Sequence, residues 1–498
     1  MRILRNGVAA TLAVVLLASG PVPALGAALQ SSGPEPRGWN GAGAGAQEAP
    51  LDEQYRETAD RIMAAALADE GGWAKLSYLC DRIGHRLSGS EALEKAVTWA
   101  AGQMRADGLE NVHLQPVKVP HWVRGRESAE MLAPVQRPLA MLALGGSVGT
   151  PPEGITAAVV AVQSFDELTA LGREKVEGRI VLYDVPWQGY GRTVVYRGRG
   201  ASEAARLGAV AMLLRSVASY SLNTPHTGAM NYAEDAPKIP AAAITVEDAA
   251  WMGRLARAGV EVKVRLKMEA KMLPDADSAN VIGEIVGREK PDEVVVIGGH
   301  IDSWDVGQGA HDDGAGTVAS MQALALLKKL GLRPRRTIRV VLWTNEENGL
   351  RGGAAYRDQA KERGELAKHV AAIEADSGGE PPAGFGLGLP FLQERPDADE
   401  VKQPALEKLR QIARLLEGIQ ASDIRDGGGG ADIGPLMREG VPGLGLRTTG
   451  DRYFHWHHTP ADTLDKVSPE DIQKQVAAMA VMAYVLADMP DRLVGPPQ

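Results

Sequence analysis

Between residues 275 and 486 the sequence alternates short, unbroken apolar runs with amphipathic stretches of helical periodicity. The apolar runs occupy residues 294–297 and 370–373, residues 337–343 are a further predicted strand, and residues 315–330 form the clearest helical stretch. Apolar runs without polar alternation are typical of strands that are buried on both faces. The pattern therefore predicts an α/β fold in which helices cover both faces of a sheet.

Two other patterns precede this region. In residues 51–109, apolar residues recur mostly at intervals of three, four and seven, which predicts helices. Residues 123–269 instead contain short β-rich runs, at 157–162, 179–183 and 209–214, separated by glycine and proline. We therefore predict that a small, β-rich domain is inserted into the main one.

The N-terminus has the three parts of a secretory signal peptide. Arg2 and Arg5 precede an apolar segment at 8–18, and small residues follow at 24–28. The apolar segment is too short for a comfortable membrane span, although an uncleaved anchor is the alternative. We expect a secreted or periplasmic protein whose mature chain does not span a membrane.

These patterns divide the chain into five segments. They are a signal peptide at 1–27, a flexible linker at 28–50, a first part of the main domain at 51–122, the insert at 123–270 and a second part of the main domain at 271–490. The linker assignment rests on a Gly-, Ala-, Pro- and Ser-rich composition.

Charge and cysteine content disfavour a nucleic-acid-binding protein and exclude a protein stabilised by intramolecular disulfides. The 498-residue chain has a formal net charge of -9 and lacks a dense Lys/Arg block, so nucleic acid is not an expected partner. Cys80 is the only cysteine, so the chain cannot form an intramolecular disulfide. Its apolar helical setting predicts a buried structural thiol.

Polar clusters follow the predicted strands and fill the loops between them. In open α/β sheets, ligands bind beyond the carboxyl ends of the strands. We therefore expect a functional site built from these clusters, with the following candidate residues: His300, Asp302, Asp312, Asp313, Glu346, Glu347, Asp376 and His458.

The residue types in these clusters favour a metal centre. Imidazole and carboxylate groups are typical ligands of catalytic zinc, which keeps one position open for water. Two metals roughly 3.5–4 Å apart can share one carboxylate and activate a water. Each cluster alone has an ordinary explanation, since Asp-Asp-Gly is a common turn and paired glutamates are often solvated. Their combination favours metal.

The motifs resemble the co-catalytic zinc aminopeptidase and glutamate carboxypeptidase superfamily. The resemblance extends from about Leu51 to about Asp488 and rests on the stretches 86–90, 151–156, 164–168, 303–309, 331–334 and 341–344. It implies the zinc-peptidase fold, with a mixed, mostly parallel sheet flanked by helices. It also implies that the β-rich insert is a protease-associated domain.

The resemblance implies a role for each site residue. The ligand sets are His300 and Asp376 for one zinc, and Glu347 and His458 for the other, with Asp312 as the bridge. Glu346 is the general base and acid, which takes a proton from the bridging water and passes it to the leaving amine. Asp302 orients the ligand His300 from outside the metal shell, and Asp313 supports the turn that carries Asp312.

Several histidines crowd the C-terminal loop. His455 and His457 lie beside His458, and we select His458 because His-Thr-Pro-x-Asp-Thr matches the family's ligand position.

The resemblance further implies a zinc-dependent exopeptidase with two Zn²⁺ per chain. It would be a homodimer that acts on dipeptides or short peptides with free termini. Two alternatives come from the same superfamily: an inactive, receptor-like protein that has lost its metal ligands, and a glutaminyl cyclase with one zinc and no insert. The full ligand set disfavours the first, and the insert disfavours the second.

Overall fold

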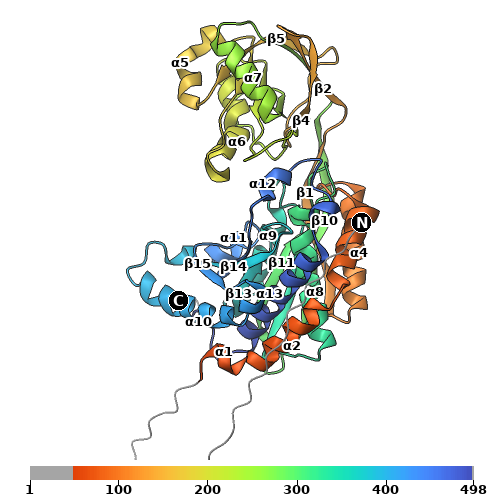
Figure 1. The fold of residues 1–498 in the computed structure, drawn as a ribbon, viewed down its shortest axis with the longest axis vertical. Helices are drawn as coiled ribbons and strands as arrows, with labels where there is room; N and C mark the ends of the chain where they lie inside the picture. The colour runs from red at the N-terminus through yellow and green to blue at the C-terminus, as the bar shows by residue number, and fades with distance from the viewer. Residues whose placement is uncertain (1–48, 496–498) are drawn as a thin grey trace, which may run out of the picture. The chain divides into compact units, whose positions relative to one another are not determined.

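The computed structural model describes residues 49–495, and an eight-stranded sheet forms the centre of the main domain (Figure 1). Its strand order is β1-β10-β12-β11-β13-β16-β14-β15. The central strands β12, β11, β13 and β16 are parallel, whereas β1, β10 and β14 join through antiparallel pairs. The strands are β1 (Glu110–Val123), β10 (Lys271–Ile285), β11 (Lys290–His300), β12 (Arg336–Trp343), β13 (His369–Glu374), β14 (Pro382–Gly388), β15 (Asp423–Asp426) and β16 (Gly443–Thr448).

Helices pack on both faces of this sheet, which confirms the predicted fold class. Successive residues of β11 point to opposite faces, so Val295 and Ile297 join one core while Val294 and Val296 join the other. The helices of the first core are α2 (Arg56–Leu67), α3 (Gly71–Tyr78), α4 (Glu91–Ala106), α8 (Ala315–Lys329), α10 (Ala398–Arg414) and α13 (Pro469–Asp488). Those of the second core are α9 (Arg351–Glu362) and α11 (Gly434–Arg438).

A second eight-stranded sheet is formed by the region that was predicted as an insert. Its order is β3-β2-β9-β5-β6-β7-β8-β4, with β5 to β8 parallel. The strands are β2 (Glu127–Ala133), β3 (Arg137–Leu139), β4 (Met141–Ala143), β5 (Ile155–Val162), β6 (Ile180–Tyr183), β7 (Ala211–Arg215), β8 (Ala241–Ile244) and β9 (Lys263–Met268).

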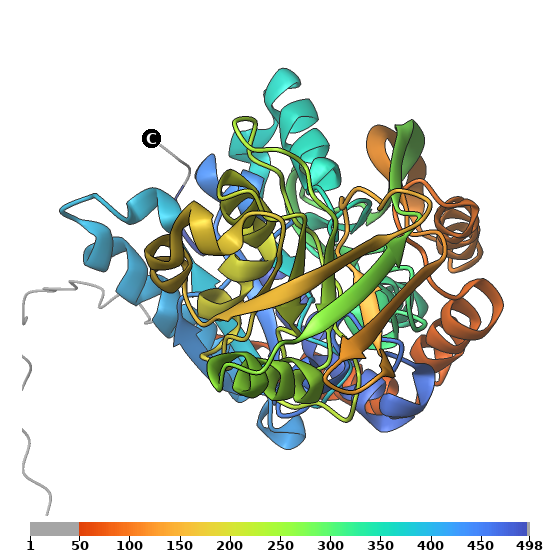
Figure 2. The same cartoon turned by 90° about the horizontal axis from the view of Figure 1, so that it is seen from above.

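This region, residues 123–270, is called the insert below after its prediction, and it also contains three helices that the sequence analysis did not predict. They are α5 (Phe165–Val176), α6 (Tyr190–Arg206) and α7 (Val246–Arg257). Figure 2 shows the yellow α5 and α6 and the green α7 beside the strands. Strand β6 is buried on both faces, because Val181 and Tyr183 pack with α5 and α6 while Ile180 and Leu182 pack with α7.

Two further predictions concern the N-terminal part and Cys80. The predicted signal peptide at 1–27, and the linker at 28–50 except for its last two residues, lie outside the described residues. Cys80 is buried, as predicted, and burial raises the pKa of its thiol to about 12. Within residues 49–495, no helix is both long and apolar enough to cross a bilayer.

Candidate metal centre

The predicted site residues lie together beyond the carboxyl ends of three parallel strands. Strand β11 ends at His300, β12 ends three residues before Glu346, and β13 ends two residues before Asp376. Asp312 lies in the turn Ala310–Gly314, directly before α8, and His458 follows the short helix α12 (Tyr453–Trp456). Because parallel strands end at the same edge of a sheet, segments far apart in sequence converge there.

His300, Asp312 and Asp376 form one side of this cluster. The Nε2 atom of His300 lies 3.2 Å from Oδ1 of Asp312 and 3.7 Å from Oδ1 of Asp376. Two ligand atoms bound to one tetrahedral zinc, each about 2.0–2.1 Å from it, are about 3.4 Å apart. The observed spacing therefore suits a shared zinc ion.

Glu347 and His458 form the other side, again with Asp312. The Nε2 atom of His458 lies 3.1 Å from Oδ2 of Asp312 and 3.1 Å from Oε2 of Glu347. Asp312 thus presents one carboxylate oxygen to each histidine, as a bridging ligand would.

Several atoms in the cluster lack ordinary partners. His300 Nε2, Asp312 Oδ2 and Asp376 Oδ1 are buried and have no hydrogen-bond partner among the described residues. A buried polar atom without a partner costs free energy, so it usually belongs to a site whose partner is an ion or water. A divalent cation would satisfy these atoms, and their nitrogen and oxygen chemistry fits zinc.

Burial and close charges shift the protonation of the cluster. Although burial opposes ionisation, contacts with His300 and His458 hold the pKa of Asp312 well below its usual range. For His300, burial alone would lower the pKa, but Asp312 and Asp376 raise it well above 6.5. The carboxylates of the cluster thus favour positive charge beside them, as expected of a cation site.

Asp302 supports the cluster through two kinds of contact. Its backbone carbonyl lies 3.0 Å from Nδ1 of His300, whose ring therefore directs Nε2 toward Asp312. Its carboxylate accepts the backbone N–H groups of Glu346 at 3.0 Å and Glu347 at 3.3 Å. Asp302 therefore contacts His300 through its main chain, and its side chain holds the paired glutamates.

Asp313 supports the backbone around the cluster. Its carboxylate accepts the N–H of His300 and the N–H of Gly316, each at 3.1 Å. Burial raises the pKa of Asp313 well above its usual range.

Asp462 has a structural role that the sequence analysis did not assign. Its carboxylate accepts the backbone N–H groups of residues 310, 311 and 312, at 3.0, 2.7 and 3.1 Å. It thereby fixes the turn that carries the predicted bridge. The sequence feature that could have indicated this role is the motif His-Thr-Pro-x-Asp-Thr, which begins at His458 and has Asp462 as its only carboxylate.

Of the two histidines beside His458, His457 is the one that approaches the carboxylate of Asp312. Its Nε2 lies 3.7 Å from Oδ2 of Asp312, and its ring stacks on His458 with centroids 3.5 Å apart. Burial lowers the pKa of His457 well below 6.5. His458 lies closer to two carboxylates, so the geometry favours it over His457 as a ligand.

A cavity of about 590 Å³ opens onto the cluster. Glu346 lines it and is half-buried. Burial, together with the negative charges of Asp376 and Glu347, raises the pKa of Glu346 well above its usual range. The insert contributes other lining residues, namely Gly145, Gly146, Tyr190, Arg197, Ala229, Met230 and Asn231.

Comparison with known families supports the metal-centre interpretation. Residues 280–483 match the model of peptidase family M28. The chain is 46% identical to mouse carboxypeptidase Q over 421 residues, which are 84% of this chain and 86% of that protein. It is 45% identical to human carboxypeptidase Q over 426 residues, 86% and 87% of the two chains. The motifs at 86–90, 151–156, 164–168, 303–309, 331–334 and 341–344 predict similarity to carboxypeptidase Q (plasma glutamate carboxypeptidase) in particular. The matches to the mouse and human proteins confirm this prediction.

Solved structures give the same assignment of fold. A peptidase M28 precursor from Shewanella amazonensis superposes with a TM-score of 0.83 at 35% identity, over 90% of this chain and 100% of that one. A zinc aminopeptidase from Bacillus subtilis gives a TM-score of 0.62 at 21% identity, over 86% and 97% of the two chains, and at that identity supports the fold alone. The zinc-peptidase fold predicted from sequence is therefore confirmed.

Proposed function

Since the chain belongs to peptidase family M28 and is a metallo-exopeptidase, we propose that it hydrolyses dipeptides or short peptides with free termini. One observation carries this proposal: buried ligand atoms without a hydrogen-bond partner among the described residues lie at a cavity that Glu346 also lines. A cavity of about 590 Å³ is of the size that holds small ligands, which favours short peptides over folded proteins.

We propose two zinc ions per chain. His300 and Asp376 would hold one, Glu347 and His458 would hold the other, and Asp312 would bridge them. Support comes from two groups of candidate ligands that have Asp312 in common. One group joins His300, Asp312 and Glu347, and the other joins Asp312, His457 and His458. A third group joins His300, Asp313 and Asp376. When bound, zinc would supply Lewis-acid chemistry for peptide-bond hydrolysis.

Glu346 is proposed as the general base and acid. Its carboxylate lines the cavity, and its backbone N–H is fixed by Asp302 at 3.0 Å. Burial raises the pKa of Glu346 above its ordinary value, which suits a carboxylate that must both accept and return a proton. The carboxylate would take a proton from the attacking water and give it to the amine nitrogen that leaves.

The remaining features of the proposal rest on sequence patterns and on resemblance. The domain boundaries at 51–122, 123–270 and 271–490, with a protease-associated insert, agree with the second sheet at β2–β9. A signal peptide at 1–27 would direct the protein to the periplasm or exterior, and a homodimer is the proposed assembly. Mass analysis of the N-terminal peptide of the exported protein tests the signal peptide. The molecular mass of the protein in solution tests the homodimer.

The substrate proposal is tested by digesting a peptide library. The library holds dipeptides and longer peptides, each with free and with blocked termini, and cleavage is followed by mass spectrometry with and without chelator. We expect cleavage of short peptides with free termini, loss of activity with chelator and recovery with Zn²⁺. Cleavage only within long or blocked peptides contradicts the proposal, as does cyclisation of N-terminal glutamine without dipeptide hydrolysis.

The role of Glu346 is tested by Glu346→Gln. We expect kcat to fall about 10²–10⁴-fold while bound zinc is unchanged, because the amide cannot accept the proton. Glu153→Gln, at an exposed position in the insert, is the matched control and should retain wild-type kcat. Wild-type kcat in Glu346→Gln would remove this residue from the reaction.

A further inference from the structure

The two sides of the metal cluster differ in what surrounds them. On the side of Glu347 and His458, the outer contacts involve the insert. On the other side, the outer contacts of His300 come from the main domain. Because the ligands of a metal are oriented by their outer contacts, this asymmetry bears on how each ion is held.

His458 is held by Thr227, a buried residue of the insert. The N–H of Thr227 donates to the backbone carbonyl of His458 at 3.0 Å, and the Nδ1 atom of His458 lies 3.3 Å from the carbonyl of Thr227. The preceding residue, His226, lies with its Nδ1 atom 2.8 Å from the carbonyl of His457. Three hydrogen bonds therefore join residues 226–227 to residues 457–458.

Two groups lie close to Nδ1 of His458: the carbonyl of Thr227 at 3.3 Å and Nη1 of Arg197 at 3.4 Å. A neutral imidazole that binds metal through Nε2 carries its proton on Nδ1, which then needs an acceptor. The carbonyl of Thr227 is the nearer of the two groups and is placed to accept that proton when His458 binds metal. His458 also has a left-handed backbone, with φ of 61°, which is uncommon outside glycine and persists where neighbouring contacts hold it.

Arg197 from α6 braces the same segment. Its Nη1 donates to the carbonyl of Thr227 at 3.3 Å, and its Nε donates to the carbonyl of Ala229 at 3.2 Å. The residue between these two carbonyls is Gly228. A Cβ there would lie 2.2 Å from Nη1 of Arg197, so only glycine lets the guanidinium approach this closely.

Glu347 also has an outer contact that reaches the insert. The backbone N–H of Trp304 donates to Oε1 of Glu347 at 3.2 Å, which leaves Oε2 facing His458. The Trp304 ring is buried in the core of the insert sheet, and a Cβ on Gly145 of the insert would lie 2.1 Å from it. Both ligands on this side are therefore oriented by groups that pack in or against the insert.

The opposite side of the cluster has main-domain contacts instead. His300 places Nδ1 3.0 Å from the carbonyl of Asp302, and its own carbonyl accepts Oγ1–H of Thr317 at 2.7 Å. The N–H of His300 donates to Asp313. These groups belong to the loop after β11, to the turn before α8 and to α8 itself.

We propose that the insert segment 226–228, braced by Arg197, is the positioning element for His458, so that one zinc of the pair depends on the insert and the other does not. This inference rests on the proposed two-zinc centre. It gives the insert a role in metal binding, in addition to lining the cavity.

The experiment measures zinc affinity in the full-length protein carrying Gly228→Ala. The zinc-loaded protein is titrated with a chromogenic chelator, and the release of each equivalent is followed. The added methyl should displace Arg197 and Thr227, so one equivalent should bind about 10–100-fold more weakly while the other is unchanged. Gly178→Ala is the matched control, because Gly178 is also an insert glycine with positive φ but has open space around it.

A second variant, Arg197→Met, keeps the test decisive if Gly228→Ala fails to fold. It removes the guanidinium without adding a Cβ, and the same selective weakening of one equivalent is expected. Cobalt substitution adds a spectroscopic check, because the absorption bands of one ion should change and those of the other should not.

Wild-type affinity for both equivalents in both variants would overturn the inference, even if their thermal stability fell, since residues 226–228 would then be structural only. Equal weakening of both equivalents would also overturn it. A wild-type protein that binds no zinc would instead reject the proposed function, and the inference with it.

Discussion

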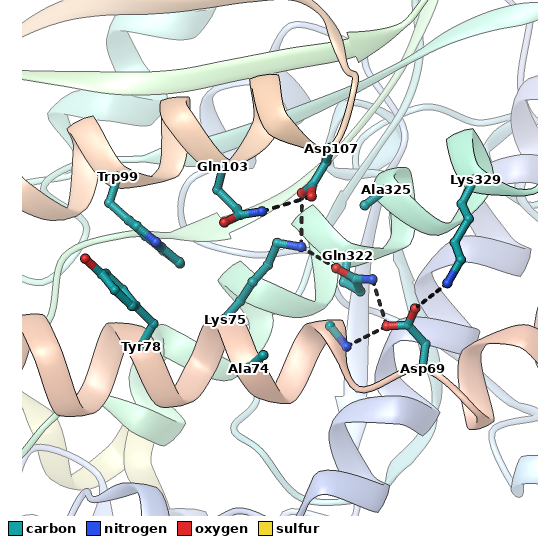
Figure 3. A pocket seen from close by; sticks show the side chains of 11 residues that line it. Asp69, Ala74, Lys75, Tyr78, Trp99, Gln103, Asp107, Gln322, Ala325 and Lys329 are labelled. Atoms are coloured by element: carbon teal, nitrogen blue, oxygen red, sulfur yellow. Dashed lines mark hydrogen bonds and ion pairs between the residues drawn. The ribbon is translucent and has the colours of Figure 1, made fainter.

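The metal centre and a second cavity, between α3, α4 and α8, both contain buried charged groups, but they differ in how those groups are paired. The second cavity has a volume of about 450 Å³ (Figure 3). Tyr78 and Trp99 form one wall, stacked with ring centroids 5.3 Å apart. Its carboxylates face lysines, Asp107 facing Lys75 and Asp69 facing Lys329, whereas the Asp312 carboxylate of the metal centre faces histidines.

Figure 3 shows the pairing in the second cavity. The Nζ atom of Lys75 lies 3.0 Å from Oδ2 of Asp107 and also contacts the side-chain carbonyl of Gln322. The amide of Gln322 donates to Asp69 at 2.8 Å, and Asp69 faces Lys329 at 3.6 Å. Opposite charges therefore alternate along one network that joins the helices.

The metal centre has the opposite arrangement. It combines carboxylates with histidines, and three of its buried atoms have no hydrogen-bond partner among the described residues. Buried charges are stable when they are paired or bind metal. The comparison teaches that buried charge alone does not identify a site: the second cavity pairs its carboxylates with lysines, whereas the metal centre surrounds Asp312 with imidazole nitrogens, which suit a metal.

The largest expected effect is that of Asp312→Ala. Removal of the proposed bridge should release both zinc ions and reduce hydrolysis to background, because each ion loses a ligand and the pair loses its link. Metal analysis and a dipeptide assay measure the two effects. Asp107→Ala, in the second cavity, is the matched control and should keep two equivalents of zinc. Retention of both ions by Asp312→Ala would place the bridge elsewhere.

The converse test is Lys75→Met in the second cavity. The substitution leaves Asp107 without its cation, so we expect the free energy of unfolding to fall by about 2–4 kcal/mol. Zinc content and kcat should remain at wild-type values. Denaturant unfolding and metal analysis check both statements. A loss of zinc here would mean that the two cavities are not independent.

A buried histidine with both nitrogens partnered gives a pH-dependent test. His369 contacts the Tyr356 hydroxyl and the Glu365 carbonyl at 2.9 Å each, and burial lowers its pKa to about 4. The unfolded chain, with a pKa near 6.5, therefore binds more protons between these two values. As the pH is lowered across that window, the contribution of His369 to stability should decrease by about 1.4 kcal/mol per pH unit.

His369→Gln should remove this dependence. The slope of unfolding free energy against pH, compared between the variant and wild type, measures it. Identical slopes from pH 6.5 to 4 would show that His369 does not titrate differently on folding.

The smallest effect is expected for Lys329→Ala. Its side chain is 75% exposed and faces Asp69 at 3.6 Å, so the ion pair is screened by solvent. We expect a change in unfolding free energy of less than about 0.5 kcal/mol. A larger loss would indicate that the network of Figure 3 depends on this exposed end.

Much of the main domain could be predicted from sequence, because its signals are local. The apolar run at 294–297 lies inside β11, and the helix predicted at 315–330 matches α8 to within one residue. His300, Glu347 and Asp376 closely follow strands, so their convergence could be predicted from the rule for strand ends, whereas Asp312 and His458 lie in other loops and were assigned by resemblance.

Other features depend on contacts between distant residues. Thr227 and His458 are 231 residues apart, and neither segment has a pattern that reveals the other. The helices of the insert were missed for a different reason. Helix α6, for example, has glycines at 191, 198 and 200, which weaken any helical signal, and it is stabilised by burial against β6 and β7.

The central claim is a two-zinc centre bridged by Asp312, and anomalous diffraction at the zinc edge from crystals of the zinc-loaded protein tests it most directly. We predict two peaks roughly 3.5–4 Å apart, one beside His300 and Asp376 and the other beside Glu347 and His458, with Asp312 between them. A single peak, or peaks away from these residues, would contradict the claim.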